Sequence, residues 1–195
     1  MASTQHTTGT AAKSHAMRWA VAGVTAAVLA ADQISKCLVM AHATAGSYSA
    51  APLSIGLAAN HGATMGVGSG SPFLVTIAAL LVAALAAAFA LRATSRTAAL
   101  LLAAVFGGAL GNLADRLLRA PGIGTGGVVD WIHLNIAGHG VSLNIADIAI
   151  QLLVPAAIVA TLLASRHAAN KSTPATAAVT PATVTATTAA YALAA

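Results

Sequence analysis

The sequence predicts an all-α membrane protein with four transmembrane helices, cytoplasmic N and C termini, and a small extracytoplasmic loop or sheet region after the first helix. Its mean hydropathy is +0.83, and 58% of the 195 residues are hydrophobic while only 7% are charged. Long Ala/Leu/Val runs alternate with short polar islands, as in integral membrane proteins. The basic residues flank the apolar runs, so the net charge of +5 indicates topology rather than a nucleic-acid partner.

The first apolar segment covers about residues 17–43, after a leader (1–16) that has no periodicity and is expected to be flexible. Its start also fits a signal peptide, because basic residues precede an apolar run that ends in small residues. The apolar pattern resumes after Lys36, which favours a retained span. Asp32 and Lys36 are four residues apart, on one face of a helix where they can pair.

Residues 44–71 are rich in Gly, Ser and Ala, which indicates a loop or a small surface sheet. The second span is predicted over 72–91, a stretch without charge and of bilayer length. The third span, 97–118, carries Gly107 and Gly111 at a spacing that is typical of close helix packing.

A loop rich in Gly and Pro precedes the fourth span, which is predicted over 143–164. The membrane domain is therefore expected to cover residues 17–167. The Ala/Thr/Pro-rich segment 168–195 has low complexity and is expected to be a disordered tail.

The basic residues other than Lys36 predict the orientation. Most of them fall on one side, which the positive-inside rule makes the cytoplasm: Lys13, Arg18, Arg92, Arg96, Arg166 and Lys171. With this topology the uncommon polar residues converge on the extracytoplasmic face, near the lipid headgroups. The sequence thus predicts a functional site there, because carboxylates near a bilayer are costly and usually functional.

The chain has four aspartates and no glutamate, and three of the four lie between residues 107 and 147. Two carboxylates held close share a proton, so that one can act as a base toward water and the other as an acid. A proton-coupled transporter and a non-catalytic scaffold are the alternatives. A metal site of His61, His133 and His139 is a further hypothesis, although their spacing fits no common ligand pattern.

The polar islands resemble those of the lipoprotein signal peptidases, or signal peptidase II, a family of bacterial membrane aspartic proteases. The resemblance extends over about residues 19–164. Five motifs occur in the family's order: DQISK (32–36), NHGATMG (60–66), GNLADR (111–116), VVDW (128–131) and NIAD (144–147). Two positions depart from the family pattern, with Met65 in place of an aromatic residue and Trp131 in place of Phe.

The resemblance implies that Asp130 and Asp147 are the catalytic pair of an endopeptidase in the bacterial inner membrane. This enzyme would cleave diacylglyceryl-modified prolipoproteins before the lipidated cysteine, without metal or cofactor. It would act as a monomer among membrane lipids, with its site at the extracytoplasmic face. The remaining motif residues are implied to bind the substrate or its lipid (Asp32, Lys36, Asn60, Gly62) or to support the site (Asn112, Asp115, Arg116, Asn144).

Spacing alone leaves structural roles open for several of these residues. Asn144 stands three residues before Asp147, as a helix N-cap stands before an acid in the first turn. Asp115 and Arg116 share a helix face with Asn112, so an internal Asp–Arg arrangement is the expectation for that pair.

Overall fold

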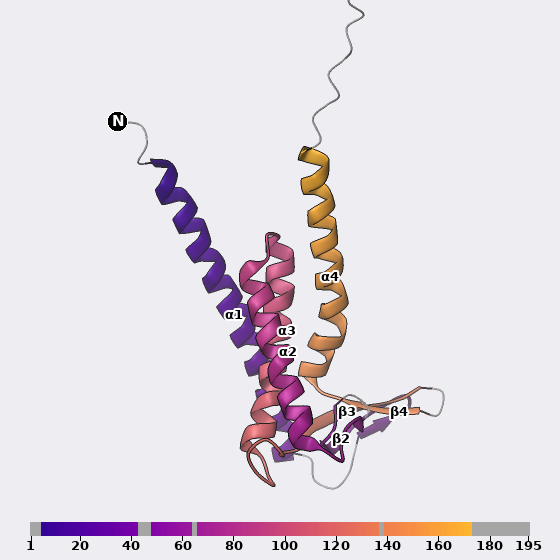
Figure 1. Ribbon diagram of the computed structural model, residues 1–195. Helices are drawn as coiled ribbons and strands as arrows, with labels where there is room; N and C mark the ends of the chain where they lie inside the picture. Colours follow the sequence, from indigo (N-terminus) through magenta and orange to yellow (C-terminus); the bar gives the residue numbers. More distant parts are fainter. Residues whose placement is uncertain (1–4, 43–47, 64–65, 137–138, 173–195) are drawn as a thin grey trace, which may run out of the picture.

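The computed structural model describes residues 5–42, 48–63, 66–136 and 139–172, and Figure 1 shows how their elements are arranged. Met65 and residues 173–195 of the predicted tail lie outside the described residues. In chain order the elements are α1 (Gln5–His42), β1 (Tyr48–Ala50), β2 (Leu53–Asn60), α2 (Pro72–Arg92), α3 (Arg96–Leu118), β3 (Val128–Ile136), β4 (His139–Leu143) and α4 (Ile145–Ser172).

Four helices among the described residues are long and apolar enough to cross a membrane, as predicted. The candidate spans are His15–His42, Pro72–Arg92, Arg96–Leu118 and Ile145–Lys171. The two central spans agree with the predicted ranges to within one residue at each end. Apolar side chains on the outside of the bundle, such as Leu81 and Leu152, are largely exposed, which is the pattern of a lipid-facing surface.

The outer helices are longer than the sequence predicted. Helix α1 begins at Gln5, inside the segment 1–16 that we expected to be an irregular leader. That segment is rich in Ala and has no Pro, so a helix can extend back through it from the apolar span. Helix α4 continues to Ser172, beyond the expected start of the tail at residue 168.

Helix α3 lies at the centre and packs against each of the other three helices. Its glycines allow close approach. A Cβ at Gly107 would lie 2.6 Å from the backbone oxygen of Thr25, and one at Gly111 would collide with the carboxylate of Asp32. The predicted close packing at these glycines is confirmed, and the partner is α1.

A four-stranded antiparallel sheet in the order β1-β2-β3-β4 lies at one end of the bundle, away from the start of α1 and the end of α4 (Figure 1). Ala58 of β2 pairs with Asp130 of β3, and Asn60 pairs with Val128. The sheet therefore corrects the all-α prediction. A sheet was expected only after the first helix, but the segment after α3 supplies two further strands, β3, which begins with two β-branched valines, and β4.

Candidate active site

Asp130 and Asp147 come from different elements and are joined by Asn144. Asp130 is the third residue of β3 and is fully buried, while Asp147 is half-buried in the first turn of α4. The side-chain amide of Asn144 donates to Oδ1 of Asp130 over 2.7 Å, and its oxygen accepts from the backbone N–H of Asp147 over 2.9 Å. The structure thus brings the two predicted catalytic carboxylates to one place.

Asn144 is also the residue that caps α4. The side chain of Asn144 accepts from the backbone of Asp147, and the backbone N–H of Asn144 donates in turn to Oδ2 of Asp147 over 3.2 Å. This reciprocal pair is a capping box with Asp in the acidic position, at the positive end of the helix. The cap predicted from spacing is therefore confirmed, and it does not compete with a role in the site.

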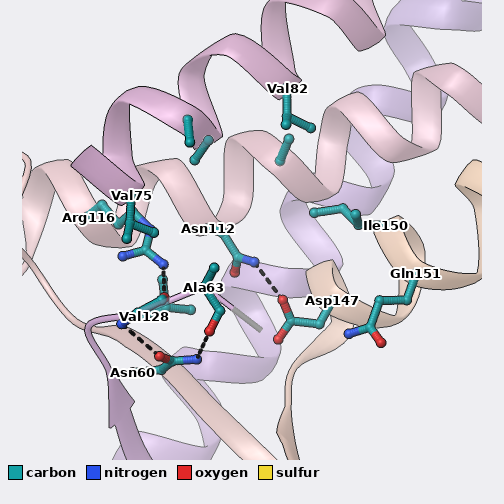
Figure 2. Close-up of a pocket in the computed structure, with 14 residues that line it drawn as sticks. Asn60, Ala63, Val75, Val82, Asn112, Arg116, Val128, Asp147, Ile150 and Gln151 are labelled. Atoms are coloured by element: carbon teal, nitrogen blue, oxygen red, sulfur yellow. Dashed lines mark hydrogen bonds between the residues drawn. The ribbon is translucent and has the colours of Figure 1, made fainter. Parts of the chain in front are cut away.

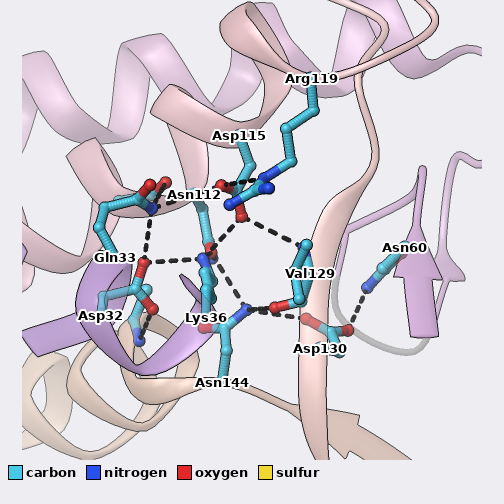
Figure 3. Close-up of polar contacts among 12 residues, drawn as sticks. Asp32, Gln33, Lys36, Asn60, Asn112, Asp115, Arg119, Val129, Asp130 and Asn144 are labelled. Carbon is cyan, nitrogen blue, oxygen red and sulfur yellow. Dashed lines mark hydrogen bonds and ion pairs between the residues drawn. The ribbon is translucent and has the colours of Figure 1, made fainter. Parts of the chain in front are cut away.

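Two further asparagine side chains donate to the carboxylates. Asn112 of α3 donates to Oδ1 of Asp147 over 2.8 Å (Figure 2), and Asn60 of β2 donates to Oδ2 of Asp130 over 3.1 Å (Figure 3). The oxygen of Asn60 accepts the backbone N–H of Gly62 over 2.9 Å, which orders the loop after β2. Each carboxylate thus receives hydrogen bonds on both oxygens.

Lys36 lies in the interior, between the other two aspartates of the chain. Its Nζ is 2.7 Å from Oδ2 of Asp32 and 2.8 Å from Oδ2 of Asp115, and all three side chains are at most 1% exposed. The predicted pairing of Asp32 with Lys36 is confirmed. The structure buries these two residues between α1 and α3, where Asp32 also accepts the backbone N–H of Ala146 over 2.9 Å.

Asp115 pairs with Arg119 (2.6 Å) and not with Arg116, so the expected pairing of neighbours was wrong. The reason is helix geometry, since residues four apart face each other and adjacent residues do not. Asp115 also accepts the backbone N–H of Val129 over 3.2 Å, which fixes β3 beside α3. Arg116 instead donates to the backbone oxygen of Gly62 and so holds the loop after β2.

Sequence reasoning missed two contributors to this cluster. Gln33 donates to Oδ2 of Asp32 and to the backbone oxygen of Gly111, which links α1 to α3. Arg119 is the second. The i,i+4 spacing from Asp115 was the signal that could have found Arg119. Gln33 stands inside the DQISK motif, but nothing in that motif predicts its contact with α3.

Burial is the main cause that raises the pKa of Asp130, and the negative charge of Asp147 raises it further, to about 6. Hydrogen bonds from Asn60 and Asn144 oppose the rise because they stabilise the ionised form. Asp130 therefore holds a proton at higher pH than an ordinary aspartate, as one member of a proton-sharing pair does.

Cavities open on both sides of the pair. One, of about 210 Å³, is bordered by Asp147, Asn112 and Arg116 and by apolar side chains of α2 (Figure 2). Another, of about 560 Å³, lies along the sheet beside Asp130 and Ser142. Asn60 borders both cavities, so the two cavities meet beside the residue that donates to Asp130.

The described residues contain no group of three His, Cys, Asp or Glu side chains that could hold a metal ion. His133 contacts Oγ of Ser142 at 2.8 Å, and His61 contacts the backbone oxygen of Thr125 at 3.2 Å. His139 lies at the start of β4. The histidines that suggested a metal hypothesis therefore have separate surroundings.

A sequence model described as "Signal peptidase (SPase) II" matches residues 24–163, a range that includes every predicted site residue. The chain belongs to the signal peptidase II family. It is thus a protein of a protease family. Its four helices of membrane-crossing length independently indicate a multi-pass membrane protein.

Curated relatives carry the same description. The lipoprotein signal peptidase of Bifidobacterium longum subsp. infantis is 36% identical over 143 residues, which cover 72% of this chain and 75% of that protein. That of Leifsonia xyli subsp. xyli is 35% identical over 122 residues (61% of this chain), and the match spans 56% of the relative's length. That of Streptomyces coelicolor is 41% identical over 91 residues, covering 47% of this chain and 43% of the relative.

Two solved structures of bacterial membrane enzymes have a similar fold. One superposes with a TM-score of 0.61 at 27% identity and covers 77% of this chain and 90% of that structure. The other has a TM-score of 0.56 at 28% identity, with coverages of 73% and 92%. The likeness includes most of the part of this chain that holds the helices and the sheet.

Proposed function

We propose that the chain is an aspartic endopeptidase that removes the signal peptide from diacylglyceryl-modified prolipoproteins by cleaving before the lipidated cysteine. Membership of the signal peptidase II family supports removal of signal peptides from prolipoproteins. The observation that carries the aspartic mechanism is the pair of carboxylates bridged by Asn144, with Asp130 buried and Asp147 half-buried.

In the proposed reaction Asp147 is the base and Asp130 is the acid. Asp147 lies at the positive end of α4, which favours a charged carboxylate, and the raised pKa of Asp130 favours the protonated form there. Asp147 takes a proton from water while the hydroxide oxygen bonds to the scissile carbonyl carbon, and Asp130 protonates the carbonyl oxygen.

Collapse of this tetrahedral intermediate breaks the C–N bond. The departing nitrogen takes the proton from Asp147, and the proton on the former carbonyl oxygen returns to Asp130. The products are a signal peptide with a new carboxyl terminus and a lipidated cysteine with a free amino group. The cycle consumes one water and requires no metal or cofactor.

The apolar part of the substrate has a suitable place between α2 and α4. The cavity beside Asp147 is lined on this side by Ala78 and Val82, and Val82 also borders a second, apolar cavity of about 510 Å³ farther along the helices. We propose that the diacyl chains lie in this groove, so that their binding energy positions the scissile bond at the carboxylates.

We further propose that both termini are cytoplasmic and that the sheet and the site face the outer side of a bacterial inner membrane. Arg92 ends α2 and Arg96 begins α3, while Arg166 and Lys171 lie near the end of α4. These helix ends all lie away from the sheet (Figure 1). Positive charge on that side supports a cytoplasmic assignment. The partners are membrane lipids and the prolipoprotein, and the enzyme acts as a monomer without nucleic acid.

The direct test is cleavage of a diacylglyceryl-modified prolipoprotein by the purified chain in lipid or detergent. Release of the signal peptide, with no release from the same prolipoprotein lacking its diacylglyceryl group, is the expected result. A proteoliposome assay for proton flux tests the transporter alternative. Proton flux without cleavage would contradict the peptidase assignment and support a transporter. All four aspartates lie toward the sheet end of the bundle, which already argues against a path across the bilayer.

A further inference from the structure

The ammonium group of Lys36 has a partner for every proton. Besides its ion pairs with Asp32 and Asp115, its Nζ donates to the side-chain oxygen of Asn112 over 3.1 Å. An ammonium has three N–H donors and no acceptor, so these contacts use all of its donors. The side chain is fully buried, and water cannot replace a lost contact easily.

This contact decides which way the amide of Asn112 points. Because Lys36 can only donate, the oxygen of Asn112 must face it, and the NH2 group must then face the other way. On that side lies Oδ1 of Asp147, which accepts from Nδ2 of Asn112 over 2.8 Å. A flipped amide would set donor against donor at Lys36 and oxygen against oxygen at Asp147.

The side-chain amide of Asn144 is oriented by the same kind of donor and acceptor contacts, but it also has a backbone partner. Its Nδ2 donates to Oδ1 of Asp130 and, over 3.2 Å, to the oxygen of Asn112, while its own oxygen accepts the backbone N–H of Asp147. The helix cap therefore fixes Asn144 independently of Lys36. Asn112 has no such backbone bond among the contacts of its side chain, so its orientation depends on Lys36 and Asn144.

We propose that Lys36 is a positioning residue for the peptidase reaction: it orients the amide of Asn112, which in turn presents an N–H to Asp147. This inference rests on the proposed function and deepens it. Lys36 donates to Asn112 (Figure 3), and Asn112 donates to Asp147 (Figure 2), so the effect of Lys36 on turnover passes through Asn112.

A double-mutant cycle tests this route. Lys36→Met removes the donor, Asn112→Leu removes the amide at nearly constant shape, and the third variant carries both changes. Each single change is expected to lower kcat roughly 10- to 100-fold, as misplaced catalytic groups do. The double variant should then be no slower than the slower single variant, because no amide is left to orient. Independent effects that multiply in the double variant would overturn the proposal.

Arg119→Met is the matched control. It removes the other cation that contacts Asp115, at 2.6 Å, but Arg119 makes no contact with Asn112. Its effect on kcat should therefore be the same with Asn112 present or replaced by Leu. If Arg119→Met were coupled to Asn112 as strongly as Lys36→Met, the route through the amide would be wrong.

Lys36→Met leaves the carboxylates of Asp32 and Asp115 buried without their shared cation, so this single variant can fail to fold. Lys36→Met combined with Asp32→Asn removes the cation together with one of its carboxylates, and this pair then takes the place of Lys36→Met in the cycle. A folded variant without Lys36 that retains the full kcat would overturn the positioning role. That outcome is distinct from failure of the proposed function, in which the unaltered chain itself releases no signal peptide.

Discussion

The side-chain amide of Asn144 lies 2.7 Å from Oδ1 of Asp130, and the same residue caps the helix that begins just before Asp147. One asparagine thus sets the place of a strand carboxylate and a helix carboxylate relative to each other. A proton-sharing pair needs such a fixed separation, because the charge of one member has to act on the other.

Replacing Asn144 by Leu should therefore impair both folding and turnover. It removes the cap of α4, which is worth about 1 kcal/mol, and leaves Asp130 with one donor fewer in the interior. We expect a lower melting temperature in detergent and loss of cleavage. Asn135→Leu, at an exposed position of β3, is the control and should change neither. Equal effects of the two changes would contradict the bridging role.

The carboxyl group of Asp130 should titrate near pH 6, since burial and the charge of Asp147 raise its pKa. The chain has only four aspartates and no glutamate, so 13C NMR of aspartate-labelled protein gives four carboxyl signals. In Asp147→Asn the midpoint of Asp130 should fall, because a negative neighbour is gone. An unchanged midpoint would mean that the two carboxylates do not interact.

The raised pKa also predicts how stability depends on pH. A carboxyl group with a raised pKa in the folded state binds its proton more tightly there than in the unfolded chain. Its stabilising contribution is complete below the unfolded pKa of 3.8 and is lost as pH rises through about 6. This loss is on the order of 3 kcal/mol. Between pH 4 and 7 the unaltered chain should lose more stability than Asp130→Asn. Parallel melting curves for the two proteins would contradict this.

Gly111→Ala should destabilise the bundle, because its Cβ would collide with the carboxylate of Asp32 beneath the site. Overpacking of this kind costs about 1–3 kcal/mol. Gly23→Ala is the matched control, since a Cβ there meets no atom within 4 Å on the exposed side of α1. It should leave the melting temperature unchanged or raise it slightly. If Gly111→Ala left the melting temperature unchanged, α1 and α3 would not be packed as closely as described.

The apolar groove leads to a prediction about substrate binding. Ala78→Phe fills the cavity beside Asp147 and should raise KM for the lipidated substrate about tenfold, which corresponds to roughly 1.4 kcal/mol of binding. Ala84→Phe adds the same ring on the same helix outside the two cavities. If both changes raised KM equally, the diacyl chains would not lie in this groove.

The central spans were predictable because long apolar runs bounded by charge have one stable solution in a membrane. The partners of the buried charged side chains could not be predicted in this way. Asp115 pairs with Arg119 rather than Arg116 because the helix turn decides which side chains meet. Burial of Lys36 depends on Asp115, which is remote in sequence, so no local pattern could reveal it.

The sheet likewise depends on pairing between segments that are distant in sequence. A glycine-rich segment after the first helix suggested a loop or sheet, but its partner strand starts at Val128, far along the chain. Pairing across that distance places Asn60 beside Asp130 and completes the site. The cap at Asn144, by contrast, depends on residues three apart and was visible in the sequence.

The measurement that tests the account most directly is signal-peptide release by the unaltered chain, Asp130→Asn and Asp147→Asn, assayed with the same diacylglyceryl-modified prolipoprotein. Each variant should insert and fold like the unaltered chain, and each should lose cleavage because no proton-sharing pair remains. Cleavage by the unaltered chain that persists substantially in both folded variants would contradict the assignment of Asp130 and Asp147 as the catalytic pair.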